Sequence, residues 1–506
     1  MQPLPLVPIP AFISASSALP DSQGLEASHL LLDTSNIPGA DSKFWLTEAN
    51  ELLAQNLTVA EPSTENANVV SRRDAPQPPA SQANLVLSID NQITNPEGYE
   101  IDINEDITIK AATNIGLLNG LRTLSQLALV KPLPKVTIKD EPRYSWRAFS
   151  VDIVRHWYGV EPLYKLIDSL AEYKFNVLHL HLSDDQGWRI EIPDYPALTE
   201  ISSRTQVDGP IPDDQIGYMT LTEYRDLQEY AATKGIIIVP EIDLPGHTHA
   251  ALHAIPELNA DGNAPDAYHG IDVGMSQLRA ANPATKPFIK TVIDSIAQNT
   301  KGEYFHIGGD ECPGLPADEY NELVKFANDV SLKNGKKTVA WQEAASLVNY
   351  QNPTPDEIKD LPLMQYWSPQ IKSDDFVNAA TAGLQVILSP AQHVYLDMKH
   401  DENDELGLVW AGQTSLEKSR DWEPEELIPG LPKAQIIGVE GALWSETCRS
   451  FDDLLKLIFP RLPAVAEVAW SAPGQAQDFI QRLKPHQELW QQRGIPAKAI
   501  ERLNTN

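Results

Sequence analysis

From Trp146 onward, short apolar runs alternate with longer amphipathic stretches along the chain. The runs have the length of buried strands, and the stretches carry apolar residues at the three- and four-residue spacing of helices. Eight runs recur, at residues 149–153, 177–182, 236–239, 304–307, 338–341, 363–366, 384–388 and 436–439. Helical stretches at 162–174, 222–234, 288–300 and 318–334 lie between several of them, and one at 452–470 follows the last. Eight alternating strands and helices predict an α/β fold, a (β/α)8 TIM barrel; a doubly wound sheet is the alternative, but it has no need of eight strands.

The chain before the barrel has a different pattern. Residues 1–26 are predicted to form an irregular arm, 30–33 and 85–89 short strands, 44–55 a helix, and 69–83 a polar, proline-rich loop. Segments 99–103 and 107–111 alternate as in a hairpin, and leucines at helical spacing follow over 114–130. We therefore expect a smaller α+β accessory domain over 1–141, the barrel over 142–475, and a C-terminal helical extension over 476–506 that packs on the barrel.

Unusual polar and aromatic residues follow the eight predicted strands. In chain order they are Arg155, Asp184, Asp185, Asp243, His247, Asp310, Glu311, Trp341, Trp367, Tyr395, Asp397, Trp444 and Glu446. Each lies at or just past the carboxyl end of a strand, which is the face where barrels build their active sites. A purely structural distribution of polar residues would not favour one end, so we expect a functional site there.

Composition narrows the classes of ligand. The 39 Lys and Arg against 70 Asp and Glu give a net charge of −31, which repels nucleic acids and anionic membranes and leaves a neutral substrate such as a sugar. The sequence contains no run of about 18 apolar residues, so no membrane-spanning helix is predicted. The apolar N-terminus lacks a basic segment, so a signal peptide is not supported, although a signal already removed is equally compatible. The compartment stays open, with a secreted or extracytoplasmic location favoured.

The segment from His306 to Glu311, HIGGDE, is the sharpest motif. Its two glycines allow a tight turn that presents two adjacent carboxylates at a strand end. A helix N-cap is the plain alternative, but Pro313 and Gly314 follow at once. The active sites of glycoside hydrolases commonly combine carboxylates with aromatic residues. Because adjacent side chains diverge, only one of the two is expected to act on the leaving group, while the other assists beside the anomeric carbon.

Seven ordered motifs resemble those of the family 20 glycoside hydrolases, the β-N-acetylhexosaminidases. They are DIVRH at 152–156, HLHLSDDQGWR at 179–189, PEIDLPGH at 240–247, HIGGDE at 306–311, WQE at 341–343, YLD at 395–397 and LWSE at 443–446. The resemblance covers roughly residues 85–470, and so many motifs in order make chance agreement implausible.

The resemblance implies an exo-acting, retaining enzyme that removes terminal β-linked GlcNAc or GalNAc from glycans or chitooligosaccharides. In that family the substrate's own acetamide oxygen attacks the anomeric carbon and forms an oxazolinium intermediate. Glu311 would be the general acid and then the base. Asp310 would orient the acetamide and stabilise its developing charge, and Tyr395 would hold the acetamide oxygen in the attack position.

The same resemblance assigns the binding residues. Trp341, Trp367 and Trp444 would box the acetamide methyl and the sugar face, and Trp410 would lie on the leaving-group side. Arg155, Asp397 and Glu446 would bind the hydroxyls of the terminal sugar and close the pocket, although each is also compatible with a rim ion pair. Asp184, Asp185, Asp243 and His247 would stand behind the reacting groups, with His247 reaching both an aspartate and Glu311. A purely structural histidine is the alternative for His247.

Two rival classes remain. Histidines 179, 181, 247, 249 and 306 beside carboxylates would suit a zinc hydrolase, but His179 and His181 lie within a strand, so no metal and no cofactor is expected. A catalytically inactive lectin is disfavoured because both acidic residues are intact. The two cysteines, Cys312 and Cys448, would both lie near the mouth, as free thiols or as a pair. The choice between GlcNAc and GalNAc, the natural glycan and the oligomeric state stay open.

Overall fold

The computed structural model describes residues 3–15, 24–53, 56–61, 82–212, 215–347, 358–474 and 478–500. The chain forms two compact units. The first comprises Met1–Arg143, Glu172–Lys174 and Trp470–Gly494, and the second comprises Tyr144–Ala171, Phe175–Ala469 and Ile495–Asn506.

The second unit is a closed barrel in which every neighbouring pair of strands is parallel. Its strands are β8 (Trp146–Asp152), β9 (Val177–His181), β14 (Ile237–Glu241), β15 (Tyr304–His306), β16 (Lys337–Trp341), β17 (Leu363–Tyr366), β18 (Val386–Leu388) and β19 (Ile436–Leu443). Every predicted run forms one of these strands, so the TIM barrel is confirmed. The lower barrel is filled by side chains that the strands point inward, among them Ala148, Val177, Val239, Val339 and Ile387. The residues between them point outward, where the helices cover them, so most positions of the runs are apolar.

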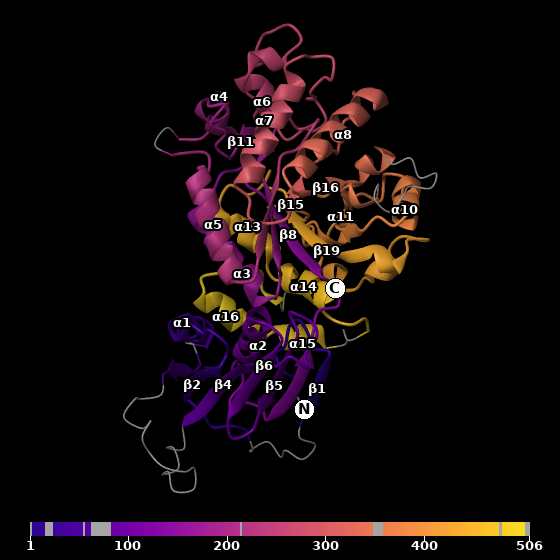
Figure 1. Ribbon diagram of the computed structural model, residues 1–506. Helices are drawn as coiled ribbons and strands as arrows, with labels where there is room; N and C mark the ends of the chain where they lie inside the picture. The colour runs from indigo at the N-terminus through magenta and orange to yellow at the C-terminus, as the bar shows by residue number, and fades with distance from the viewer. Residues whose placement is uncertain are drawn as a thin grey trace. The chain divides into compact units, whose positions relative to one another are not determined.

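Helices surround the barrel strands (Figure 1). The longer ones are α3 (Glu161–Glu172), α5 (Leu221–Thr233), α7 (Thr285–Gln298), α8 (Ala317–Lys333), α10 (Asp374–Thr381), α13 (Phe451–Ile458) and α14 (Arg461–Trp470). Shorter ones are α4 (Ala197–Glu200), α6 (His249–Ala254), α11 (Ala391–Val394) and α12 (Leu416–Arg420). The predicted helix over 452–470 is in fact two, α13 and α14, because Pro460 has no N–H with which to continue the first. None of the described helices is both long enough and apolar enough to cross a bilayer.

The first unit is a seven-stranded sheet in the order β1-β7-β5-β6-β4-β2-β3. Its strands are β1 (Phe12–Ala15), β2 (His29–Asn36), β3 (Thr58–Ala60), β4 (Gln82–Ile89), β5 (Tyr99–Ile103), β6 (Ile107–Ala111) and β7 (Val136–Asp140). Helices α1 (Ser42–Leu53) and α2 (Asn114–Leu127) share one apolar core with the sheet and lie on the same side of it in Figure 1. The predicted hairpin is β5 and β6, joined in antiparallel register.

Three strands of this unit, β1, β3 and β7, were not predicted. The arm over 1–26 is not irregular throughout, because β1 pairs antiparallel with β7. Most of the loop predicted over 69–83 lies outside the described residues.

The C-terminal helices α15 (Phe479–Leu483) and α16 (His486–Gln492) fall in the first unit. Arg482 Nη1 donates to the carbonyl oxygen of Leu6 over 2.5 Å, and His486 Nε2 lies 2.9 Å from that of Pro5. Residues 470–494 are thus grouped with the N-terminal residues, a different arrangement from the barrel extension that we expected for 476–506.

Candidate active site

A cavity of about 340 Å³ opens at the carboxyl ends of the barrel strands. Most of the residues expected at the site line it: Arg155, Asp184, Asp243, His247, Asp310, Glu311, Trp367, Tyr395, Trp410, Trp444 and Glu446. They come from the ends of β8, β9, β14, β15, β17, β18 and β19 and from the loops that follow. One cavity therefore unites groups that are almost 300 residues apart in the chain.

Three expected residues stand behind the cavity wall. Trp341 is fully buried, donates from Nε1 to Glu241 over 2.9 Å, and has its ring 6.1 Å from that of Trp444. Asp397 is also buried. Asp185 accepts a hydrogen bond from the backbone N–H of His249 over 3.0 Å and another from the hydroxyl of Ser276. None of the three is among the residues that line the cavity.

The two adjacent carboxylates follow β15 on a tight, left-handed turn. Gly308, Gly309 and Glu311 have φ angles of 70°, 104° and 47°. Positive φ is ordinary for glycine but costs free energy in glutamate, so the surroundings must hold Glu311 in place. The next helix, α8, begins only at Ala317, which removes the alternative of a helix cap. Asp243 accepts the N–H of Gly309 over 3.1 Å, and Tyr320 donates to its carbonyl over 2.6 Å.

Replacing Gly308 by alanine is expected to loosen this turn. A Cβ at Gly308 would overlap the carboxylate of Asp243 and lie 2.7 Å from its Cα, whereas one at Gly335 meets nothing within 4 Å. Both glycines have positive φ, so Gly335→Ala isolates the backbone cost of about 1–2 kcal/mol. Gly308→Ala should lower the free energy of unfolding by about 1–3 kcal/mol more than this control, measured by urea unfolding. Equal losses in the two variants would contradict the close packing of the turn on Asp243.

His247 links the carboxylates electrostatically. Its Nδ1 lies 3.1 Å from Asp184 Oδ1, and its Nε2 lies 3.3 Å from Glu311 Oε2 and 3.7 Å from Asp310 Oδ2. Burial alone would lower the pKa of His247, but the charges of Asp184, Asp310 and Asp243 outweigh it and raise that pKa well above its usual range. The imidazole is therefore a cation that faces the reacting pair.

Burial has the opposite effect on the carboxylates, whose pKa it raises. Burial raises the pKa of Asp310 to about 6. The positive charge of His247 opposes this shift, and the charge of Glu311 adds to it. Burial also raises the pKa of Asp243 well above its usual range, and the charge of Asp310 adds to the effect. A side-chain hydrogen bond with Asp243 works the other way and lowers the pKa of Asp310.

Aromatic rings form one side of the cavity. Trp367 stacks parallel to Tyr395, with centroids 6.4 Å apart and planes 10° apart. Trp410 meets both rings edge-on, at 5.9 and 5.8 Å, and the ring of Trp444 lies 6.1 Å from Tyr395. Burial, with the charge of Asp310, raises the pKa of Tyr395 well above its usual range, so its hydroxyl stays a donor. Such a wall suits the apolar face of a sugar and a methyl group.

Charged groups lie beside the aromatic rings. Arg155 Nη2 lies 2.8 Å from Asp184 Oδ2, and its guanidinium lies 5.2 Å above the ring of Trp444. Both carboxylate oxygens of Asp397 and one of Glu446 are buried with no hydrogen-bond partner among the described residues. Burial raises the pKa of Glu446 to about 7, against the nearby Arg155. Buried acceptors without partners are costly unless a ligand satisfies them, and sugar hydroxyls would do so.

Several residues at the site were not predicted from the sequence. His181, Ile271 and Val273 also line the cavity, although His181 was considered only as a metal ligand within a strand. Glu343 accepts a hydrogen bond from Trp367 Nε1 over 3.1 Å, and burial with the charge of Asp310 raises its pKa to about 8. Its place in the WQE segment was a signal that could have been used, because that segment follows a strand. Ile271 and Val273 belong to a loop without any recognisable pattern.

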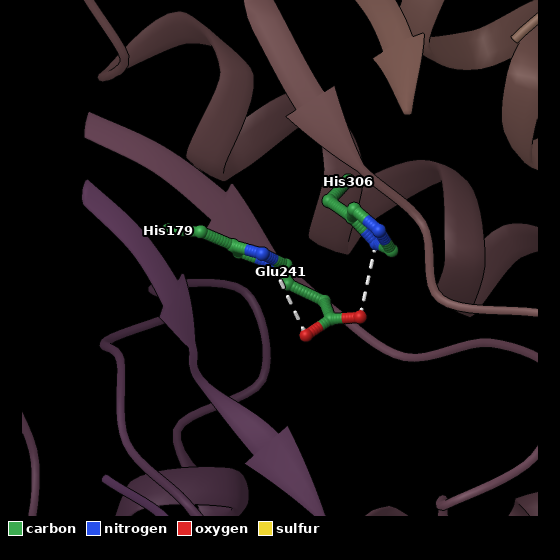
Figure 2. A group of neighbouring side chains, drawn as sticks. All are labelled: His179, Glu241 and His306. Atoms are coloured by element: carbon green, nitrogen blue, oxygen red, sulfur yellow. Dashed lines mark ion pairs between the residues drawn. The ribbon is translucent and has the colours of Figure 1, made fainter. Parts of the chain in front are cut away.

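The chain also contains two cysteines and several clusters of potential metal ligands. Cys312 and Cys448 are both free thiols. Among the described residues, His179, Glu241 and His306 bring one potential ligand atom each within 4.8 Å of the others (Figure 2). Three similar groups are His181 with Glu241 and Asp243, Asp184 with Asp185 and His247, and Asp310 with Asp243 and His247. These side chains already engage one another through ion pairs.

Comparison with known proteins identifies close relatives. Residues 144–328 and 318–473 match the model of the glycosyl hydrolase family 20 catalytic domain, and residues 36–141 match domain 2 of that family. A β-N-acetylhexosaminidase of Cellulomonas fimi is 42% identical over 407 residues, which cover 79% of each chain. A β-hexosaminidase of Vibrio furnissii is 32% identical over 476 residues, covering 86% of this chain and 76% of the relative.

Solved structures agree with these matches. The N-acetyl-β-hexosaminidase of Streptomyces plicatus, in complex with Thio-NAglucal, superposes with a TM-score of 0.84 at 33% identity over 99% of this chain and 98% of its own. A mutant of the Streptomyces plicatus enzyme in complex with its product GlcNAc has a TM-score of 0.83 at 34% identity, over 98% of this chain and 96% of its own.

Proposed function

Because the chain belongs to glycosyl hydrolase family 20, as an enzyme of the β-N-acetylhexosaminidase class, we propose that it is exo-acting and retaining and uses substrate-assisted catalysis. The proposed substrates are glycans or chitooligosaccharides that end in a non-reducing β-linked GlcNAc or GalNAc. The observation that carries the proposal is the placing of Asp310, Glu311 and Tyr395 around one cavity beside an aromatic wall.

In the proposed reaction the acetamide oxygen of the substrate attacks C1 of the terminal sugar. Glu311 gives its proton to the departing glycosidic oxygen as the C1–O bond breaks, and an oxazolinium ring forms. The carboxylate of Glu311 then removes a proton from water, which attacks C1 from the face that the leaving group vacated. The ring opens, the acetamide is restored, and two inversions give net retention of configuration.

Asp310 and Tyr395 would prepare the acetamide for this attack. The Tyr395 hydroxyl, kept protonated by burial, would donate to the acetamide oxygen. Ionised Asp310 would accept the acetamide N–H and stabilise the positive charge that develops on nitrogen. The reacting oxygen and C1 belong to one sugar, so these two residues would act by holding the acetamide in the conformation from which it attacks.

The two ends of the cavity support exo action. Arg155, with Glu446 near it and Asp397 behind Glu446, would take up the outermost hydroxyls and leave no room for a further sugar. At the mouth, Trp410, Ile271 and Val273 are exposed apolar residues that would contact the leaving group. Trp341 would support the wall from behind through Trp444.

Following the products of chitooligosaccharide hydrolysis by NMR tests the proposed function. We expect one GlcNAc to be released per step from the non-reducing end, first appearing as the β-anomer, since the mechanism retains configuration. Internal cleavage would contradict exo action, and an initial α-anomer would contradict the substrate-assisted route.

A further inference from the structure

Glu241 is a buried carboxylate with no part in the reaction described above. It is the last residue of β14, and none of its surface is exposed. Figure 2 shows its side chain between the imidazoles of His179 and His306. Burying a carboxylate costs free energy unless several hydrogen-bond donors surround it. The partners of Glu241 therefore indicate its role.

Each oxygen of Glu241 faces two nitrogen atoms. Oε1 accepts a hydrogen bond from Trp341 Nε1 over 2.9 Å and lies 2.9 Å from His306 Nδ1. Oε2 lies 2.5 Å from His181 Nδ1 and 3.2 Å from His179 Nε2. Burial alone would raise the pKa of Glu241, but the imidazoles of His306, His181 and His179 outweigh it and hold that pKa well below its usual range. Burial lowers the pKa of His306 itself, so the positive charge beside Glu241 belongs to His181 and His179, whose pKa values are raised.

Two of these partners lead directly to the catalytic cavity. Trp341 packs behind Trp444, and the ring of His181 meets Trp444 edge-on at 5.0 Å, so Glu241 holds both supports of one wall residue. His181 Nε2 also lies 2.7 Å from Asp184 Oδ2. The other oxygen of Asp184 contacts His247, the cation that faces Glu311.

Protons, and not a metal ion, account for this cluster. Nδ1 of His179 lies 2.7 Å from Glu440 Oε1, and its Nε2 lies 3.2 Å from Glu241 Oε2. Both ring nitrogens of His179 therefore face carboxylate oxygens, although only Nδ1 makes a hydrogen bond, and a doubly protonated ring would have no lone pair for a metal. Although burial opposes it, the charges of Glu241 and Glu440 raise the pKa of His179 to about 10. A charge of opposite sign on each side is the arrangement that makes such burial tolerable.

We propose that Glu241 is a positioning residue of the active site, which fixes the Trp444 wall through Trp341 and His181 and fixes His247 through His181 and Asp184. This inference rests on the proposed roles of Glu311 and its neighbours. Glutamine at position 241 has nearly the same shape, but it removes the charge and turns an N–H₂ group toward nitrogen donors. The wall and His247 should then shift together, and Arg155, which also contacts Asp184 Oδ2, should shift with them.

Glu440 offers a matched control. It is buried to the same extent in the neighbouring part of the barrel and also contacts His179, but its other partners are Gln365 and Trp146, which do not line the cavity. Glu241→Gln is expected to lower kcat on an aryl β-N-acetylglucosaminide about 100-fold, because small displacements of reacting groups have effects of that size. KM should rise by a smaller factor, because Arg155 is displaced only indirectly, through His181 and Asp184. Glu440→Gln should leave kcat within about threefold of the wild-type value, since its contacts do not reach the reacting groups.

Both variants are assayed at a temperature at which circular dichroism shows them folded. Equal losses of kcat in the two would overturn the inference, as would an unchanged kcat in Glu241→Gln or stoichiometric metal in the purified wild-type protein. If Glu241→Gln does not fold, Glu241→Asp takes its place: it keeps the charge but withdraws the oxygens, and kcat should again fall at least tenfold, as expected for a misplaced supporting group. An inactive wild-type enzyme would instead refute the proposed function itself.

Discussion

Glu311→Gln is expected to lower kcat by at least about 100-fold on chitooligosaccharides, because the amide cannot protonate the departing oxygen. Glu311 lines the cavity and lies 3.3 Å from the cation of His247, and glutamine preserves its shape. KM should change little, since Arg155 and the aromatic wall are untouched. Steady-state kinetics on chitobiose measure both constants.

The dependence on the leaving group separates acid catalysis from a structural fault. With a highly acidic phenol as leaving group, little protonation is needed, so Glu311→Gln should lose far less activity on that substrate than on chitobiose. Glu257→Gln makes the same chemical change at an exposed site and serves as the control. Equal losses on the two substrates would show that Glu311 is not the general acid.

Asp310→Ala is expected to lower kcat by about 100-fold or more on every substrate, whatever its leaving group, because the acetamide loses the carboxylate that orients it and balances its charge. The defect should also weaken inhibition by the acetamide-derived thiazoline, which resembles the cyclic intermediate. A variant with wild-type kcat would remove Asp310 from the mechanism.

The pH dependence gives a further readout for Asp310. Burial raises its pKa to about 6, so the carboxyl gains a proton and loses its charge as the pH falls through that value. Activity that depends on the ionised form should be present above this pH and decline below it. Asp310→Asn has no such proton to gain, so the part of the acid limb due to Asp310 should be absent from its residual activity.

The fold was predictable where one physical rule governs a long segment. A strand buried inside a barrel must be apolar on both faces, and each predicted run therefore became a barrel strand. The short strand β1, Phe12–Ala15, escaped prediction because four residues give no period, and it owes its existence to its partner β7. The break at Pro460 was visible in the sequence but was outweighed by the apolar pattern on both sides of it.

The site was predictable in position but not in depth. The ends of the strands identified which residues meet, since all carboxyl ends of a parallel barrel lie at one face. They did not distinguish Trp444, which lines the cavity, from Trp341, which lies behind it. Depth depends on how neighbouring strands stagger, and this information is spread over the whole barrel. Glu241 was overlooked for the same reason, because an acidic residue at a strand end resembles any other until its partners are known.

The three-part make-up of the first unit limits how this protein can be divided. Its residues come from the start of the chain, from Glu172–Lys174 and from Trp470–Gly494, so a single cut in the polypeptide cannot release it whole. A fragment ending near residue 143 would lack Arg482 and His486, the partners of Leu6 and Pro5. A barrel expressed alone from residue 144 onward would still contain Glu172–Lys174 and Trp470–Gly494, which belong to the first unit. Exchange of modules between relatives therefore has to transfer both ends of the chain together.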